Sequence, residues 1–141
     1  MQYKNIDDTY TIIINKGEEV ISGLTEFCKK HGIRNGYFRG IGAVEKLECG
    51  YYNLEEKKYY FTNYNDMLEV VSLTGNIMIK DGEPFIHVHG VFTDTTNNAF
   101  GGHIKEMTVG VTLEIILTQL GTHLDRQLDE DIGLFLINCP N

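Results

Sequence analysis

The sequence predicts an α+β fold in which a mainly antiparallel, strand-rich sheet packs against one principal amphipathic helix. One segment has the helical spacing of apolar residues, and nearly all of the remaining chain consists of short β-branched and aromatic runs separated by turn residues. The third observation is length, because 141 residues is close to the commonest size of one domain. We therefore expect residues 1–141 to form a single domain.

The helix is expected within residues 15–33, NKGEEVISGLTEFCKKHGI. Apolar residues recur there at spacings of three and four, which on a helix form one buried stripe. This stripe consists of Val20, Ile21, Leu24, Phe27 and Cys28. We expect Glu18 and Glu19 in the first turn and basic residues in the last turn, where both oppose the helix dipole, and Gly32 as a left-handed end.

The strands follow from runs of β-branched and aromatic residues. They are expected at residues 9–15, 36–53, 57–63, 67–80, 84–94, 103–110, 111–120 and 133–139. Gly40 and Gly42 inside the second run indicate a bulge or a close backbone approach. One helix against many strands favours a mainly antiparallel sheet.

Composition and charge restrict the class of protein. The chain has 20 acidic and 12 basic residues, and its adjacent basic pairs at 29–30 and 57–58 form no longer cluster. Because attraction to phosphate backbones depends on concentrated lysine and arginine, DNA is a possible partner that the charge does not favour. No apolar run approaches the roughly 18 residues of a membrane span, and the N-terminus lacks the pattern of a secretory signal. We expect a cytoplasmic protein without membrane contact.

The three cysteines, Cys28, Cys49 and Cys139, are widely spaced and include no CxxC pair. This pattern is typical neither of a disulfide framework nor of a zinc knuckle. We expect all three to be buried, reduced thiols.

The segment PFIHVHGVFTDTTNNAFGGH, residues 84–103, contains three of the five histidines. Side chains alternate along a strand, so His87 and His89 share one face while the even-numbered residues around them face the core. If residues 85–93 and 101–107 form a hairpin with His89 opposite His103, His87 lies on the diagonal. Opposed and diagonal neighbours lie about 5 Å and about 7–8 Å apart, within reach of one ion.

Three neutral imidazoles suit borderline metals and leave a fourth coordination position for water or substrate. Gly101 and Gly102 would let the backbone approach closely beside the third histidine. The pattern predicts that His87, His89 and His103 bind a divalent metal ion, with zinc as the first candidate and nickel and iron still open. The alternative is a polar cluster at an interface.

Glu69 and Glu114 lie within strongly apolar strands, where an acidic residue is costly unless it is paired. Both are candidates for catalytic proton transfer, and an outward-facing charge is the simpler interpretation of each. His31 at the helix end and His123 in a turn are interpreted as structural. The sequence has no nucleophile elbow, phosphate-binding loop or dinucleotide fingerprint.

At these residues the chain resembles the PPC domain family, also called DUF296, which occurs as a standalone protein in prokaryotes and fused to AT-hooks in plant nuclear proteins. The resemblance covers most of the chain from about residue 36 onward and runs, in order, through GIGAVEKLECGYYN, LEVVSLTGNI, PFIHVHGVFTD, GGH, VTLEIIL and LDRQLDEDIGLFLI. It implies an α+β fold assembled as a homotrimer. It also implies that the histidines matching His87, His89 and His103 hold a metal ion in prokaryotic members.

The chain departs from the plant members at two points. It lacks the Arg-Gly-Arg-Pro core with which an AT-hook enters the minor groove. The plant Gly-Arg-Phe-Glu-Ile-Leu motif aligns with DMLEVV, residues 66–71, where Glu69 is retained while Asp66 and Met67 replace Gly and Arg.

Three functions from different classes remain open. The first is a metal-binding, homotrimeric interaction module with a regulatory or DNA-associated role. The second is a zinc-dependent enzyme acting on a small molecule, by analogy of fold to α-acetolactate decarboxylase, with Glu69 or Glu114 shuttling protons. The third is a plain DNA-binding protein. The sequence does not decide whether the protein is an enzyme.

Overall fold

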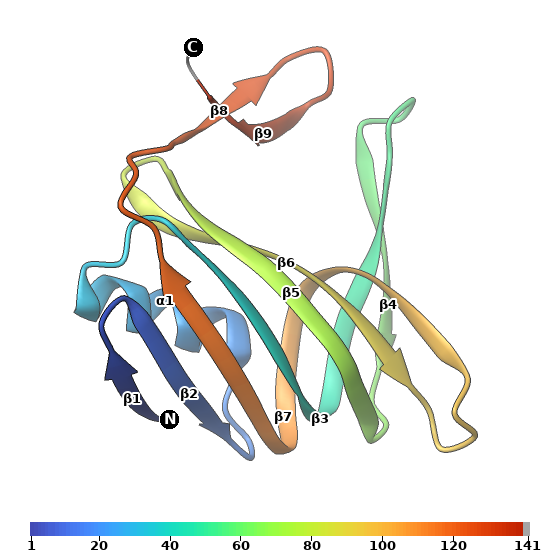
Figure 1. The fold of residues 1–141 in the computed structure, drawn as a ribbon. Coiled ribbons are helices and arrows are strands. Elements are labelled where there is room, and N and C mark those ends of the chain that lie inside the picture. The colour runs from blue at the N-terminus through green and yellow to red at the C-terminus, as the bar shows by residue number, and fades with distance from the viewer. Residues whose placement is uncertain (140–141) are drawn as a thin grey trace.

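The structure is a computed structural model that describes residues 1–139, and these form one helix and nine strands (Figure 1). The elements are β1 (Gln2–Ile6), β2 (Thr9–Asn15), α1 (Val20–His31), β3 (Gly36–Asn53), β4 (Lys58–Tyr64), β5 (Leu68–Lys80), β6 (Glu83–Thr93), β7 (Ala99–Gln119), β8 (Arg126–Asp129) and β9 (Leu134–Ile137). All the strand pairs are antiparallel. The predicted α+β class is confirmed.

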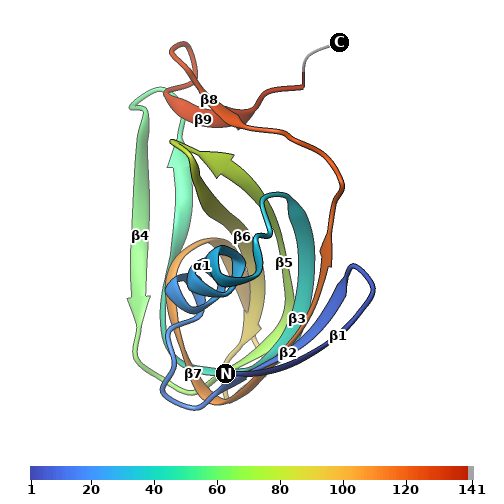
Figure 2. The same cartoon turned by 90° about the vertical axis from the view of Figure 1, so that its left-hand side faces the viewer.

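Seven strands form one sheet in the order β1-β2-β7-β6-β5-β3-β4. The long strands β3 and β7 also pair with each other, so the pairings β3–β5, β5–β6, β6–β7 and β7–β3 close a ring of four strands. β8 and β9 form a separate hairpin beyond one end of this sheet, as Figure 1 and Figure 2 both show. The sheet therefore curves enough to enclose a core on one face and to expose the other.

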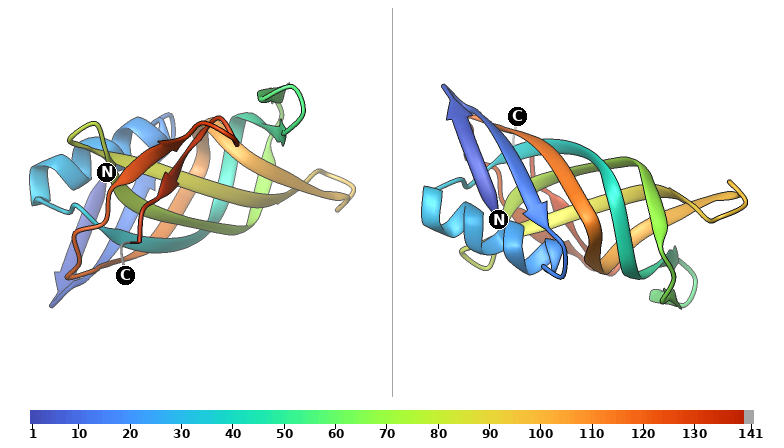
Figure 3. Two further views of the ribbon diagram at one scale, coloured as in Figure 1. Left: turned by 90° about the horizontal axis from the view of Figure 1, so that it is seen from above. Right: turned by 90° about the horizontal axis from the view of Figure 1, so that it is seen from below.

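Helix α1 lies in the hollow of the curved sheet and packs against β6 and β7 (Figure 2; Figure 3 shows the same arrangement from both ends). The predicted apolar stripe faces this hollow. Val20, Leu24, Phe27 and Cys28 are buried, and Ile21 packs against the core while partly buried. Within the described residues no helix is both long enough and apolar enough to span a membrane.

The ends of α1 agree only partly with the prediction. Gly32 ends the helix with a φ of 66°, the left-handed conformation that glycine adopts without a steric penalty. At the other end the prediction was wrong, because Glu18 and Glu19 precede the helix and its first turn contains no acidic residue. Glu19 is instead the N-cap, where its carboxylate accepts hydrogen bonds from the backbone N–H groups of Ile21 (3.1 Å) and Ser22 (2.6 Å).

Several strand boundaries also differ from the prediction. The two strands expected at 103–110 and 111–120 are one continuous strand, β7, and two short strands, β1 and β8, were not predicted. The expected irregularity in β3 is confirmed, because its register with β5 shifts between Gly40 and Gly42. The continuous β7 matters for the site, since it connects the histidine region to the core of the sheet.

The cysteine prediction is confirmed at two positions and wrong at the third. All three thiols are free, and Cys28 and Cys49 are buried. Burial raises the pKa of the Cys28 thiol to about 12, so it is an unreactive core residue. Cys139 is exposed, because it lies after the last strand rather than within a buried one.

Candidate metal centre

Strand β6 alternates between the core and the opposite face, as its sequence predicts. Ile86, Val88 and Phe92 are buried within the core. His87 and His89 point to the other face, where the first is partly buried and the second is exposed. The two imidazoles therefore lie on the outer face of the sheet, away from α1.

The predicted register is confirmed at the histidines, because His89 on β6 pairs with His103 on β7. The hairpin is shorter than expected. β6 and β7 pair only through residues 89–93 and 99–103, whereas residues 85–88 pair with β5 alone and β7 pairs with β3 from His103 onward. His103 therefore pairs with β6 on one edge of β7 and with β3 on the other, and beyond it the pairing with β6 ends.

The structure brings the three histidines together. One ring nitrogen of each of His87, His89 and His103 lies within 4.8 Å of the corresponding atoms of the other two. The ring centroids are separated by 5.1, 5.2 and 5.3 Å. Within residues 1–139 no cysteine or carboxylate belongs to this group. Three convergent imidazoles are a donor set that zinc and similar ions prefer.

His103 lies against two aromatic side chains of β4. Its ring centroid is 4.7 Å from that of Tyr59 and 6.3 Å from that of Phe61. Its Nδ1 is buried and has no hydrogen-bond partner. Burial, reinforced by the neighbouring histidines, lowers the pKa of His103 to about 4. This imidazole is therefore neutral at pH 7, which is the form that binds a metal ion.

His87 is held by a residue that the sequence did not single out. Arg126, at the start of β8, contacts Nδ1 of His87 through Nη2 at 3.2 Å and donates to Oδ1 of Asn76 at 2.7 Å. Burial, and after it the positive charge of Arg126, lowers the pKa of His87 to about 4. Because an arginine N–H can only donate, Nδ1 of His87 is the acceptor in the metal-free protein, which places the ring proton on Nε2, and an ion bound through Nε2 would have to displace that proton.

These observations fit a metal ion. His87 and His103 are neutral near pH 7, the three imidazoles converge, and a buried ring nitrogen of His103 lacks any partner. A buried polar atom without a partner is costly, and an ion that took this nitrogen as its ligand would satisfy it.

The other predicted residues lie elsewhere. Glu69 and Glu114 have exposed side chains and together line a shallow hollow on the outer face, separate from the histidine group. His31 packs among aromatic rings at the end of α1, with its ring centroid 4.4 Å from that of Phe27. His123 is exposed in the segment between β7 and β8.

Gly101 permits the close pairing of β6 and β7 beside the histidines. A Cβ atom at this position would lie 2.1 Å from the carbonyl oxygen of Gly90, which is well inside van der Waals contact. We therefore expect Gly101→Ala to lower the free energy of unfolding by about 1–3 kcal/mol, since the strands must separate to accommodate the methyl group. The measurement is urea denaturation. Gly121→Ala, where nothing lies within 4 Å, is the control and should change stability little. Equal effects of the two substitutions would contradict this account.

The lowered pKa values of His87 and His103 predict a pH dependence for the metal-free protein. The unfolded chain protonates these rings near the ordinary value of 6.5, but the folded chain does so only near 4. The stabilisation is therefore fully present above about pH 6.5 and is lost as the pH falls towards about 4. After allowance for solvent screening at these partly exposed rings, we expect a loss of about 2 kcal/mol between about pH 7 and about pH 5.

Urea denaturation at several pH values measures this loss. The double variant His87→Gln, His103→Gln should show a flatter dependence over the same range, because it lacks both titrating groups. If the free energy of unfolding of the double variant falls as steeply with decreasing pH as that of the wild type, other groups cause the loss of stability.

Solved structures with the same fold come from several prokaryotes. A proposed DNA-binding protein from Bacteroides thetaiotaomicron has a TM-score of 0.94 and 28% identity, covering 97% of this chain and 96% of its own. A plant- and prokaryote-conserved (PPC) protein from Pyrococcus horikoshii has a TM-score of 0.88 and 31% identity, with 99% and 95% covered. A metal-containing protein from Archaeoglobus fulgidus has a TM-score of 0.84 and 30% identity, with 96% and 97% covered.

A more distant similarity concerns the fold alone. The α-acetolactate decarboxylase from Bacillus subtilis has a TM-score of 0.56 and 14% identity, covering 89% of this chain and 58% of its own. None of the curated proteins compared with this chain matches it.

The family resemblance predicted from the sequence is confirmed at the level of the whole fold. The family profile described as the Plants and Prokaryotes Conserved domain matches residues 1–121, which include all three clustered histidines. This chain therefore belongs to the Plants and Prokaryotes Conserved (PCC) domain family.

Proposed function

We propose that this protein binds a divalent metal ion, with zinc as the first candidate, through His87, His89 and His103. It acts as a homotrimeric interaction module with a regulatory role in the cytoplasm. The observation that carries the proposal is the convergence of three ring nitrogens within 4.8 Å of one another. Three protein ligands would leave at least one coordination position open, as in sites where zinc binds water or a ligand. The metal-containing relative from Archaeoglobus fulgidus supports the proposal.

Elemental analysis tests the metal proposal. Protein purified without an affinity tag should contain about one metal ion per chain, and removal of the ion with a chelator followed by addition of zinc should restore that ratio. A ratio near zero that zinc does not raise would contradict the proposal.

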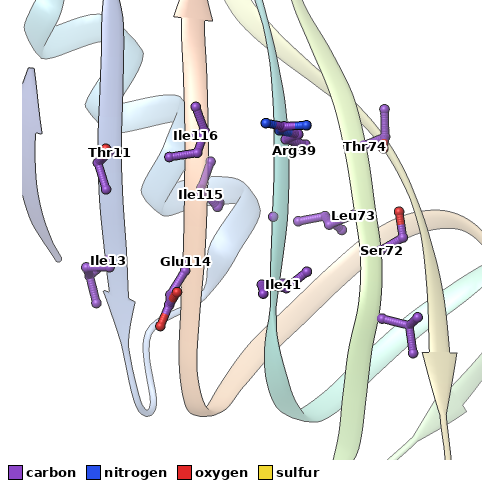
Figure 4. Close-up of a pocket in the computed structure, with 12 residues that line it drawn as sticks. Thr11, Ile13, Arg39, Ile41, Ser72, Leu73, Thr74, Glu114, Ile115 and Ile116 are labelled. Atoms are coloured by element: carbon purple, nitrogen blue, oxygen red, sulfur yellow. The ribbon is translucent and has the colours of Figure 1, made fainter. Parts of the chain in front are cut away.

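The proposed assembly into a homotrimer is supported by exposed apolar residues on the outer face of the sheet. Ile41 on β3, Val71 on β5 and Ile116 on β7 are exposed apolar side chains around a hollow of about 440 Å³ (Figure 4). Exposed apolar side chains beside polar ones such as Arg39 and Glu114 are typical of an interface, and closed cyclic symmetry would cover them without forming a fibre. The number three comes from the family resemblance. Light scattering coupled to size-exclusion chromatography should give about three times the 16.0 kDa chain mass.

Binding of DNA is the second candidate, because proteins of the same fold from Bacteroides thetaiotaomicron and Ralstonia eutropha are proposed DNA-binding proteins. The net charge of -8 opposes it. We expect weak binding without sequence preference at physiological salt, far from the roughly 10⁻⁸ M of specific complexes. A mobility-shift titration measures this. A tight and sequence-selective complex would favour the DNA function over ours.

An enzymatic function is supported by one observation, a cavity beside His87 and His103. An ion at the histidines would act there as a Lewis acid or would activate water. Neither Glu69 nor Glu114 belongs to the histidine group or lines this cavity, so a proton shuttle would need another residue. Turnover of a small molecule that chelation abolishes would establish an enzyme.

A further inference from the structure

A cavity of about 240 Å³ lies between the β8–β9 hairpin and the large sheet. His87 and His103 line it together with the cations Arg126 and Lys80. Aromatic and aliphatic side chains complete the wall, namely Tyr59, Phe85, Leu134, Phe135 and Leu136. No carboxylate lines this cavity, although the chain as a whole has an excess of acidic residues. Its charge is therefore opposite in sign to that of the protein.

Arg126 is the main source of this charge, and it is buried. Only 8% of its surface is exposed. Its guanidinium donates from Nη1 to the carbonyl oxygen of Phe135 at 2.9 Å and from Nη2 to Oδ1 of Asn76 at 2.7 Å, and Nη2 also contacts Nδ1 of His87. All three acceptors are neutral. The Nε–H group is buried and has no partner.

A buried charge without a counterion is unusual, because removing an ion from water is costly unless an opposite charge compensates it. Within residues 1–139, no carboxylate oxygen lies within 4.0 Å of the side-chain nitrogens of Arg126. The fold thus holds this guanidinium in place by neutral contacts while leaving its charge uncompensated.

Lys80 adds a second cation to the wall of the cavity. Its Nζ lies 4.0 Å from the ring centroid of Phe135 and 5.4 Å from that of Phe85. The ring faces attract the ammonium group but do not neutralise it. Like Arg126, Lys80 has no carboxylate partner among the described residues.

We propose that this cavity binds a small organic carboxylate, whose negative charge lies between Arg126 and Lys80 and whose apolar part contacts Phe85 and Phe135. The planar guanidinium suits a carboxylate, with which it forms paired hydrogen bonds. The apolar wall favours a carbon chain over a strongly hydrated inorganic anion. The volume lies below the roughly 300–1,000 Å³ of sites for drug-sized molecules, so the ligand is small.

This site does not require a bound metal ion, because Arg126 and Lys80 form it without one. It is therefore tested on metal-free protein. A chelator removes the metal, and dialysis then removes the chelator. The probes are butanoate, its neutral counterpart butanamide, and inorganic phosphate. Binding is followed by chemical-shift changes in two-dimensional nuclear magnetic resonance spectra.

Butanoate should bind saturably, while butanamide and phosphate should bind at least about tenfold more weakly. Arg126→Gln should weaken butanoate binding by at least about tenfold. Arg126 also contacts β9, so its replacement could disturb the hairpin. Lys80→Gln is therefore a second test, because the Lys80 side chain makes no hydrogen bond within the described residues. This variant should also weaken butanoate binding. Arg34→Gln, at an exposed arginine that does not line this cavity, is the matched control and should bind like the wild type.

Equal binding of butanoate and butanamide, or binding of butanoate that neither Arg126→Gln nor Lys80→Gln weakens, would overturn the proposal. Stronger binding of phosphate than of butanoate would overturn the assignment to carboxylates. Elemental analysis of the same preparations before chelation reports separately on the histidine site, so failure of one proposal is distinguishable from failure of the other.

Discussion

Replacing His89 by alanine is expected to lower the affinity for zinc by at least about 100-fold. Loss of a residue that merely supports a ligand costs roughly 10–100-fold, and loss of the ligand itself should cost more. His89 suits this test because its side chain is exposed, so its removal leaves the core intact. Titration of metal-free protein with zinc against a competing chelator measures the change.

His123→Ala is the matched control for this experiment, since His123 is also exposed but lies outside the group of three. It should bind zinc like the wild type, and His103→Ala should lose affinity as His89→Ala does. If His89→Ala and His123→Ala bind zinc equally well, the three histidines do not form the site.

Introducing a charge at Ile41, on the outer face of the sheet, is expected to convert the proposed homotrimer into monomers. Ile41 has 58% of its surface exposed in the single chain and adjoins the hollow of Figure 4. In Ile41→Glu, a carboxylate buried at each subunit contact beside Glu69 and Glu114 should weaken association by at least about 100-fold, because burial of a charge among like charges costs several kcal/mol. Light scattering should then report a mass near 16.0 kDa.

Leu54→Glu is the control for this change. Leu54 has the same 58% exposure but lies in the turn between β3 and β4, which does not line the hollow. This variant should keep the mass of the wild type. A trimer that persists in Ile41→Glu would show that another surface forms the contacts, and a monomeric wild type would refute the assembly itself.

The geometry of the histidine site could be predicted because it depends on local rules. The two-residue period of a strand placed His87 and His89 on one face, and a hairpin register placed His103 opposite His89. The same rules did not show where the hairpin would end. That depends on where β7 separates from β6 while it stays paired with β3 on its other edge, and no local pattern indicates such an end of pairing.

The polar and short elements were harder to predict than the buried ones. All five residues of β1 are exposed, so this edge strand lacks the alternation that reveals a half-buried strand. The N-cap of α1 was placed within the helix because Glu19 resembles a first-turn acid, although its side chain reaches forward to cap the backbone. In both cases the residue types agree with more than one local structure.

Arg126 was missed for a different reason. It lies in the polar run LDRQLDED, where an arginine is usually solvated. Its burial results from packing of the β8–β9 hairpin over the large sheet, which brings it to Asn76 and His87. The only signal in the sequence was the resemblance of this run to the family, and that resemblance did not single out the arginine.

The X-ray absorption spectrum of the zinc-loaded protein tests the central claim most directly, because it reports the atoms that surround the ion. The proposal predicts a first shell of nitrogen and oxygen at about 2.0–2.1 Å, with the outer scattering pattern of three imidazole rings. In His89→Ala the contribution of one ring should disappear. A spectrum of the wild-type protein with at most one imidazole, or with a sulfur shell at about 2.3 Å, would contradict a site formed by His87, His89 and His103.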